Sequence, residues 1–261
     1  MAVTEIPVCA NGPGLLESRL KSARQVADRF ASHVEVIFFR EAQSLAAVPM
    51  IGTAFNASPR HDLAQPARDQ ETGRMARAKD AFDRWMASAG TGTAKWSTVA
   101  GSAADLLPSR ARACDLIVAG GPGEGSSSST LDDAVSATAL LSSGRMTLLA
   151  PRPEHLAGDT FRRVLIAWDD SAAVARTMAQ AMPLIAAAGE VRLLVGETSP
   201  ENATSCNEIL AYLRRKGARP GVARSAPAFR TVRETLVRQA RELEASLIVM
   251  APAARPATAR P

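Results

Sequence analysis

The sequence predicts an α/β fold with two tandem domains, each an open, Rossmann-like parallel sheet with helices on both faces. One observation behind this is that residues 6–39 run as an apolar segment, a turn, a helix-period segment and a second apolar segment, and that 164–195 repeat the order. Another is that 102–120 and 231–251 share a plan, because each has a helix-period segment that leads into an apolar run. We therefore interpret the chain as an internal duplication.

The predicted helices have apolar residues at steps of three and four, which is typical of one buried helix face. In the first half this stripe is Leu16, Leu20, Ala23, Ala27 and Phe30. In the second half it is Val174, Met178, Ala181 and Ile185. Asp170 or Ser171 is predicted to cap that second helix, and Asp170 is favoured. Further helices are expected at 71–89 and near 206–216, and a final strand of the first half at 146–150.

Turn-forming residues and prolines mark the irregular parts of the first half. The segment 40–72 is predicted to be a loop because it contains Pro49, Gly52, Pro59 and Pro66. Pro7 falls inside the first strand, which should be central and would lose a ladder hydrogen bond there. Pro108 falls inside the helix that leads to Cys114. Both prolines indicate that the first half tolerates residues that a regular central strand or helix would exclude.

The composition is that of a globular protein, with 46% hydrophobic and 22% charged residues. We expect a cytoplasmic location, because the N-terminal segment lacks the features of a signal peptide and no apolar run is long enough to span a membrane. The three cysteines form no CxxC and lie far from the histidines, which argues against disulfides and a zinc site. GxxxxGK[ST], GxSxG and HExxH are all missing from the sequence, so we predict no enzyme.

The charge balance is basic, with a formal net charge of +5 and a pI of about 9.6. Such a balance can indicate a nucleic-acid partner. We interpret the arginines instead as scattered along solvated helix faces, and the chain has only three Trp, one Tyr and seven Phe, with no interleaving of aromatic and basic residues. The sequence therefore predicts neither a nucleic-acid partner nor a membrane partner.

The stretch VLIAWDDSAAVARTMAQAMPLI, the later LEASLIVM and the duplicated layout resemble the tandem universal stress proteins, in which two domains of that family are fused. The resemblance implies a parallel sheet of strand order 3-2-1-4-5, pairing of two molecules through the fifth strand, and ATP or AMP binding in some members, without robust catalysis. It divides the chain into a domain at 1–152, a linker at 153–161, and a C-terminally truncated second domain at 162–251. The segment 252–261 is expected to be disordered.

The resemblance also implies which residues face a nucleotide. An Asp at the end of the first strand corresponds to Asp169 in the second half, while the first half has Asn11 at that place and so lacks the carboxylate. Gly120 and Gly123 reproduce the first two glycines of the phosphate loop that follows the fourth strand. The loop is incomplete, because Asp133 and Ala134 stand where a Gly and a Ser or Thr belong.

In the second half, Met250 ends the corresponding fourth strand. Ala251 and Ala254 then replace the glycines of the phosphate loop. We interpret both nucleotide sites as degenerate, so no cofactor is certain, although ATP or AMP is possible. Asp169 and Asp170 are adjacent at a strand end and so point in different directions, which argues against a carboxylate pair for catalysis or a metal. Trp168 is expected to pack on a helix, with stacking on a base as the alternative.

Two functions remain open from the sequence, with a third less favoured. The first is a regulatory or binding protein of the stress response that acts through protein contacts and a homodimer, paired by the exposed strand near 146–149 (Met146 to Leu149). The second is a weak ATP- or AMP-binding protein that uses Asp169 of the second domain. An ATP-hydrolysing enzyme is the least favoured, because it would need a metal-binding carboxylate and a complete phosphate loop.

Overall fold

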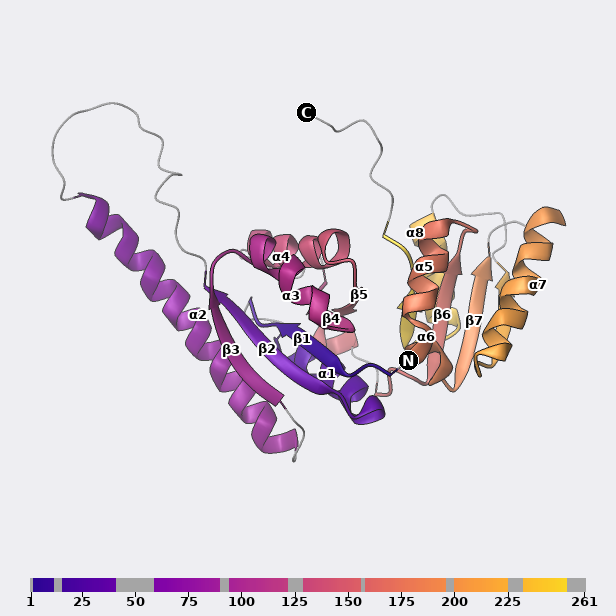
Figure 1. Cartoon of the computed structure of the whole chain (residues 1–261), viewed down its shortest axis with the longest axis horizontal. Helices are drawn as coiled ribbons and strands as arrows, with labels where there is room; N and C mark the ends of the chain where they lie inside the picture. The colour runs from indigo at the N-terminus through magenta and orange to yellow at the C-terminus, as the bar shows by residue number, and fades with distance from the viewer. Residues whose placement is uncertain are drawn as a thin grey trace, which may run out of the picture. The chain divides into compact units, whose positions relative to one another are not determined.

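The computed structural model describes residues 2–11, 16–40, 59–89, 94–121, 129–155, 158–195, 200–224 and 232–252, and it divides the chain into two units (Figure 1). The N-terminal unit is 3–156, and the C-terminal unit is 157–261 together with residues 1–2. Each unit holds one parallel sheet with helices on both faces, as predicted. The division falls inside the segment predicted as the linker. The exact domain bounds stay a prediction.

The N-terminal unit contains a five-stranded parallel sheet of order β3-β2-β1-β4-β5, which confirms the predicted 3-2-1-4-5. Its strands are β1 (Glu5–Cys9), β2 (His33–Arg40), β3 (Ala94–Ala100), β4 (Leu116–Gly120) and β5 (Met146–Ala150). Its α-helices are α1 (Leu16–Phe30), α2 (Pro59–Ala89), α3 (Ala103–Arg110) and α4 (Ser129–Ser142), with short 3-10 helices at Ala111–Ala113 and Pro153–His155. Helices α3 and α4 share one hydrophobic cluster on the sheet, whereas α1 packs against α2 and the central strands.

Helix α2 corrects the predicted loop, because it begins at Pro59 rather than near residue 71. Proline is well tolerated in the first turn of a helix, where its missing N–H would have no intrahelical partner, so Pro59 marks a start and not a loop. Pro66 lies within the second turn and the helix continues past it. Near the other end of α2, the Phe82 ring packs 5.7 Å from the Trp96 ring of β3. This contact holds the helix against the edge of the sheet.

Pro7 lies in the central strand β1 and shortens one of its ladders. The Thr4 carbonyl accepts from the His33 amide and the Ala10 amide donates to the Ile37 carbonyl, both on β2. Because successive residues of a strand alternate in direction, the backbone groups of Pro7 and Cys9 face β4. Without an N–H at Pro7, β1 and β4 share a single ladder pair, Val8 with Val118. The corresponding strands of the C-terminal unit share three pairs. The strand forms despite its proline, but a single ladder pair joins β1 to β4. We call this junction the seam.

The C-terminal unit contains a parallel sheet of order β8-β7-β6-β9 in the described residues. Its strands are β6 (Arg163–Trp168), β7 (Glu190–Val195), β8 (Pro220–Arg224) and β9 (Leu247–Val249). Its helices are α5 (Ala172–Gln180), α6 (Met182–Ala186), α7 (Pro200–Arg215) and α8 (Val232–Glu242). The ladder registers align Val8 with Ile166 and Val118 with Val249. No helix in the described parts of either unit is long and apolar enough to cross a membrane.

In both units, the residue before the fourth strand fastens the amino end of the first strand. Asp115 Oδ2 accepts hydrogen bonds from the Thr4 amide at 2.7 Å, the Thr4 hydroxyl at 2.7 Å and the Glu5 amide at 3.1 Å. Ser246, aligned with Asp115, accepts one from the Arg163 amide at 2.9 Å. Burial raises the pKa of the Asp115 carboxyl, but these hydrogen bonds outweigh it and hold the pKa below its usual value. We call the Asp115 arrangement the strand clamp.

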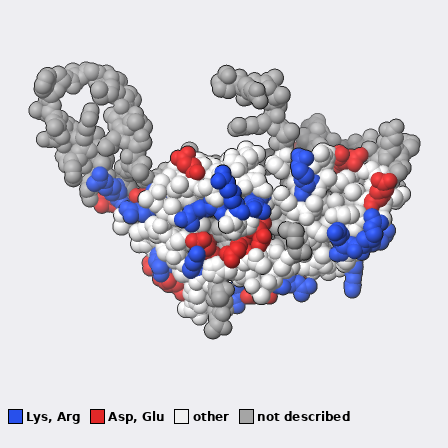
Figure 2. Space-filling model, in the orientation of Figure 1, with Lys and Arg blue, Asp and Glu red and all other residues white. Residues whose placement is uncertain are grey.

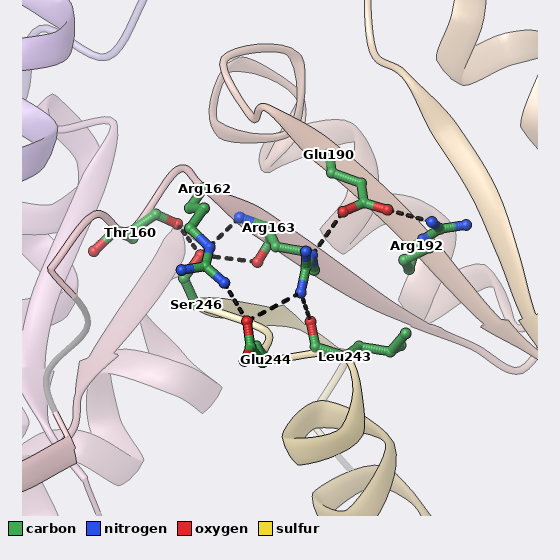
Figure 3. A network of polar contacts seen from close by, with 8 residues as sticks. All are labelled: Thr160, Arg162, Arg163, Glu190, Arg192, Leu243, Glu244 and Ser246. Atoms are coloured by element: carbon green, nitrogen blue, oxygen red, sulfur yellow. Dashed lines mark hydrogen bonds and ion pairs between the residues drawn. The ribbon is translucent and has the colours of Figure 1, made fainter.

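The corresponding hydrogen bond of Ser246 in the C-terminal unit is surrounded by ion pairs (Figure 3). Arg163 Nε donates to Glu190 at 2.6 Å, and Arg163 Nη1 donates to the Leu243 carbonyl and lies 3.7 Å from Glu244. The hydrogen bond from Arg163 is the main reason that the pKa of Glu190 is lowered. These contacts lie at the amino edge of the sheet, which leaves the opposite, carboxyl edge for a ligand.

Candidate functional site

In open parallel sheets, ligands bind beyond the carboxyl ends of the strands, at the point where the strand order reverses. In the N-terminal unit that point lies between β1 and β4, and in the C-terminal unit between β6 and β9. Asn11 and Gly120 flank the first of these points, and Asp169 and Met250 flank the second. The structure therefore brings these residues to the predicted edge of each sheet, while Gly123 lies outside the described residues.

Asn11 is a buried structural link between two strands. Its Nδ2 donates to the Phe39 carbonyl at 2.8 Å, and its Oδ1 accepts from the Phe39 amide at 3.0 Å. This pairing needs a donor and an acceptor on one side chain, which an amide supplies and an ionised carboxylate does not. Asn11 is thus engaged with β2 at both ends of its amide.

Arg19 is the residue that the sequence interpretation missed. It belongs to α1 and is only 1% exposed. Its Nη1 donates to the Cys9 carbonyl at 2.5 Å and to the Asn11 carbonyl at 2.7 Å. Since the Cys9 carbonyl faces β4, the guanidinium lies at the reversal point itself. The signal was present in the sequence: position 19 falls on the apolar stripe, three residues after Leu16 and four before Ala23.

Gly120 is the last residue of β4 and is buried. Its carbonyl accepts a hydrogen bond from the Ser136 hydroxyl of α4 at 2.7 Å. This bond ties the end of β4 to the helix behind it. Gly123 belongs to residues 122–128, which lie outside the described parts of the chain.

The two adjacent carboxylates of the C-terminal unit have separate partners. Asp169 is exposed, and its Oδ1 accepts from the Ser171 amide at 3.0 Å. Asp170 has a left-handed backbone, with φ of 61°, and its Oδ1 accepts from the Ser205 hydroxyl of α7 at 2.6 Å. The cap of α5 is Ser171, whose Oγ accepts from the Val174 amide at 3.2 Å. The favoured cap, Asp170, was therefore wrong, because its turned backbone aims the carboxylate at α7.

Trp168 and Met250 complete the carboxyl edge of the C-terminal sheet. The indole Nε1 of Trp168 is buried and has no hydrogen-bond partner within the described residues. The Met250 side chain is 52% exposed. With Asp169, these two residues offer a carboxylate and apolar surface but no basic group of their own.

The described residues contain no group of three or more His, Cys, Asp and Glu side chains that could hold a metal ion. All three cysteines are buried, and none of them forms a disulfide. Burial raises the pKa of the Cys114 thiol to about 11, so this thiol stays protonated at neutral pH and is a poor nucleophile. The three cysteines are small residues of the buried core.

Neither protein-family models nor curated proteins give a match to the sequence. Among solved structures, a universal stress protein from Archaeoglobus fulgidus DSM 4304 matches with a TM-score of 0.63 and 14% identity, over 94% of this chain and 85% of that one. A protein assigned as a universal stress protein from Pseudomonas aeruginosa UCBPP-PA14 matches with a TM-score of 0.52 and 15% identity, over 95% and 81%. Likeness at these identities concerns the fold, and this chain has the fold of the universal stress proteins.

Proposed function

We propose that this chain is a cytoplasmic, universal-stress-type regulatory protein that acts through protein contacts, with nucleotide sites that no longer work. The observation that carries the proposal is the state of the N-terminal reversal point, where the buried Arg19 guanidinium hydrogen-bonds two backbone carbonyls and Asn11 hydrogen-bonds Phe39. The groups that would meet a nucleotide are already used to hold the sheet together. Catalysis is not part of the proposal.

ATP or AMP does not fit the N-terminal unit for two reasons. Asn11 is only 8% exposed, and each end of its amide already makes a hydrogen bond to Phe39, so its side chain is turned to β2 and away from a ribose hydroxyl. The Arg19 charge is 1% exposed, and moving it toward a phosphate would leave the Cys9 and Asn11 carbonyls without their donor. An unsatisfied buried carbonyl costs about 1–3 kcal/mol, which opposes such a movement.

The C-terminal unit supports a second candidate function, weak binding of ATP or AMP. Asp169 is exposed at the carboxyl edge, and among the described residues its Oδ1 accepts a hydrogen bond from the Ser171 amide while Oδ2 is available to a hydroxyl donor. Ala251 argues against nucleotide binding in this unit. It stands at the position aligned with Gly120, and a Cβ there keeps backbone amides away from phosphate oxygens.

A titration with ATP and Mg²⁺, followed by thermal denaturation and calorimetry, tests the proposal. A ligand at one hundred times its dissociation constant adds about 2.7 kcal/mol to stability, which is readily seen as a rise in Tm. We expect no rise in the wild-type chain at millimolar ATP. A rise that Asp169→Ala abolishes and Asp159→Ala leaves intact would establish the second candidate and overturn our conclusion about the degenerate sites.

Our proposal also includes a homodimer formed through β5. This strand lies at the edge of its sheet, and four of its five residues are half-buried. An open edge with apolar side chains pairs readily with another strand. We expect a dimer by light scattering, which Leu148→Lys converts to a monomer. Leu141→Lys, at a 53% exposed position of α4, is the matched control and should leave the dimer intact. A monomeric wild-type chain would contradict the prediction.

A further inference from the structure

The net charge of the chain is confined to one of its units. Residues 157–261 contain 15 Lys and Arg against 10 Asp and Glu, a net charge of +5. Residues 1–156 contain 16 of each, a net charge of zero, and the two together give the 31 and 26 of the whole chain. Within the C-terminal unit, residues 209–233 contain seven Lys and Arg and no acidic residue. The excess charge is therefore local.

Four of these cations lie close together at the end of α7. Arg214 and Arg215 form its last turn, Lys216 follows directly, and Arg219 precedes β8. All four are exposed, and Figure 2 shows Lys and Arg side chains gathered over this end of the helix. We call these four residues the basic surface.

The basic surface is free of internal ion pairs. Acidic partners hold Arg162, Arg163 and Arg192 elsewhere in the unit, whereas no described acidic group lies within 4.0 Å of the four cations. Cations at the C-terminal end of a helix do stabilise the helix through its dipole. This explanation covers the last turn of α7 but not Arg219, which lies four residues beyond the helix. Four unpaired charges at one place favour a polyanionic partner.

The surroundings of the basic surface favour nucleic acid over a membrane or an acidic peptide. The exposed large hydrophobic residues in the described chain are Leu141, Val237, Ile248 and Met250, and none lies on α7, so nothing there would insert into a bilayer. The half-buried ring of Tyr212 lies one turn before Lys216, whose ammonium is 5.7 Å from the ring centroid. An aromatic ring among cations suits a base stacked beside its phosphate.

We propose that the basic surface of the C-terminal unit binds the phosphate backbone of single-stranded nucleic acid without sequence preference. Arginine supplies three of the four cations, and its planar guanidinium can donate two parallel hydrogen bonds to a phosphate. Four phosphate contacts release about 0.7 counterion each, so the affinity should fall roughly fifty-fold between 50 mM and 200 mM salt.

The test measures binding of a short fluorescein-labelled single strand by fluorescence anisotropy at several salt concentrations. We compare the wild-type chain with two variants whose net charge is +1, since each loses four cations from +5. One is R214Q/R215Q/K216Q/R219Q, on the basic surface. The other is K21Q/R29Q/R68Q/R112Q, which removes four exposed cations of the N-terminal unit. Circular dichroism verifies that both variants are folded.

We expect the first variant to bind about tenfold more weakly or worse and to lose most of the salt dependence, while the second binds nearly as the wild type does. Equal weakening in both variants would overturn the proposal, because net charge alone would then explain binding. Absence of wild-type binding at 50 mM salt would overturn it as well. Polyglutamate and phosphatidylserine vesicles serve as parallel probes, and tighter binding to either than to the single strand would assign the surface to that other class of partner.

Discussion

Replacing Arg19 by methionine is expected to destabilise the N-terminal unit by about 3 kcal/mol. Methionine fills a similar volume but donates no hydrogen bond, so the Cys9 and Asn11 carbonyls would both be left unsatisfied in the interior. Exchanging a buried charge for an apolar group is harmless only when its hydrogen-bond partners are replaced too. Here the partners are backbone carbonyls, which a side-chain substitution cannot replace. Arg19→Lys should lose less, because an ammonium still donates.

Urea denaturation measures this effect, read by the fluorescence of Trp85 and Trp96. Both lie in the N-terminal unit, so a Trp168→Phe background makes the signal specific for that unit. The control is Arg29→Met on the exposed face of the same helix, which should change stability by less than about 0.5 kcal/mol. If Arg19→Met and Arg29→Met unfold at the same urea concentration, the guanidinium of Arg19 does not hold the reversal point together.

Removing the strand clamp by Asp115→Ala is expected to cost about 2 kcal/mol at pH 7, because three donors on Thr4 and Glu5 lose a charged acceptor. Folding lowers the pKa of Asp115, so the carboxylate stabilises the folded state in full above the ordinary carboxyl pKa of about 4. That stabilisation is lost as the pH falls through the lower pKa of the folded state. The difference between wild type and variant should therefore shrink in acid.

The same fluorescence-detected denaturation, repeated from pH 7 down to pH 3, measures this loss. Asp115→Ser introduces the residue that the C-terminal unit has at the aligned position, and it should keep part of the stability without its pH dependence. Asp80→Asn, at an exposed carboxyl of α2, is the control and should follow the wild type. A difference between wild type and Asp115→Ala that stays constant with pH would rule out the carboxylate as its source.

The sequence was sufficient for the fold because the alternation of apolar runs and helix-period segments is a local property that appears twice. The sequence was insufficient for the start of α2, because a proline such as Pro59 is found both in the first turn of a helix and in a loop. The edge position of Asp169 was predictable from its place after an apolar run. The role of Asn11 was not, because its partner Phe39 lies 28 residues away and meets it only across two paired strands.

Counting charges over the whole chain also concealed the local excess of positive charge in the C-terminal unit. Over all 261 residues the arginines look scattered, and this interpretation led to the prediction that the chain has no nucleic-acid partner. Counted by unit, the excess is all in the C-terminal one, and four members of it surround the end of α7. The sequence contains this information, but the boundary that makes it visible comes from the fold.

The single ladder pair between β1 and β4 has a consequence for motion. The two sides of this seam, β3-β2-β1 and β4-β5, each have longer ladders of their own. They are joined across the seam by the pair of Val8 with Val118 and, at the amino end, by the hydrogen bonds of Asp115 with Thr4 and Glu5. Cooperative units of local unfolding follow such boundaries. Amide hydrogens of β4 that face β1 should therefore exchange faster with deuterium than those that face β5, and the sheet opens first along its own centre.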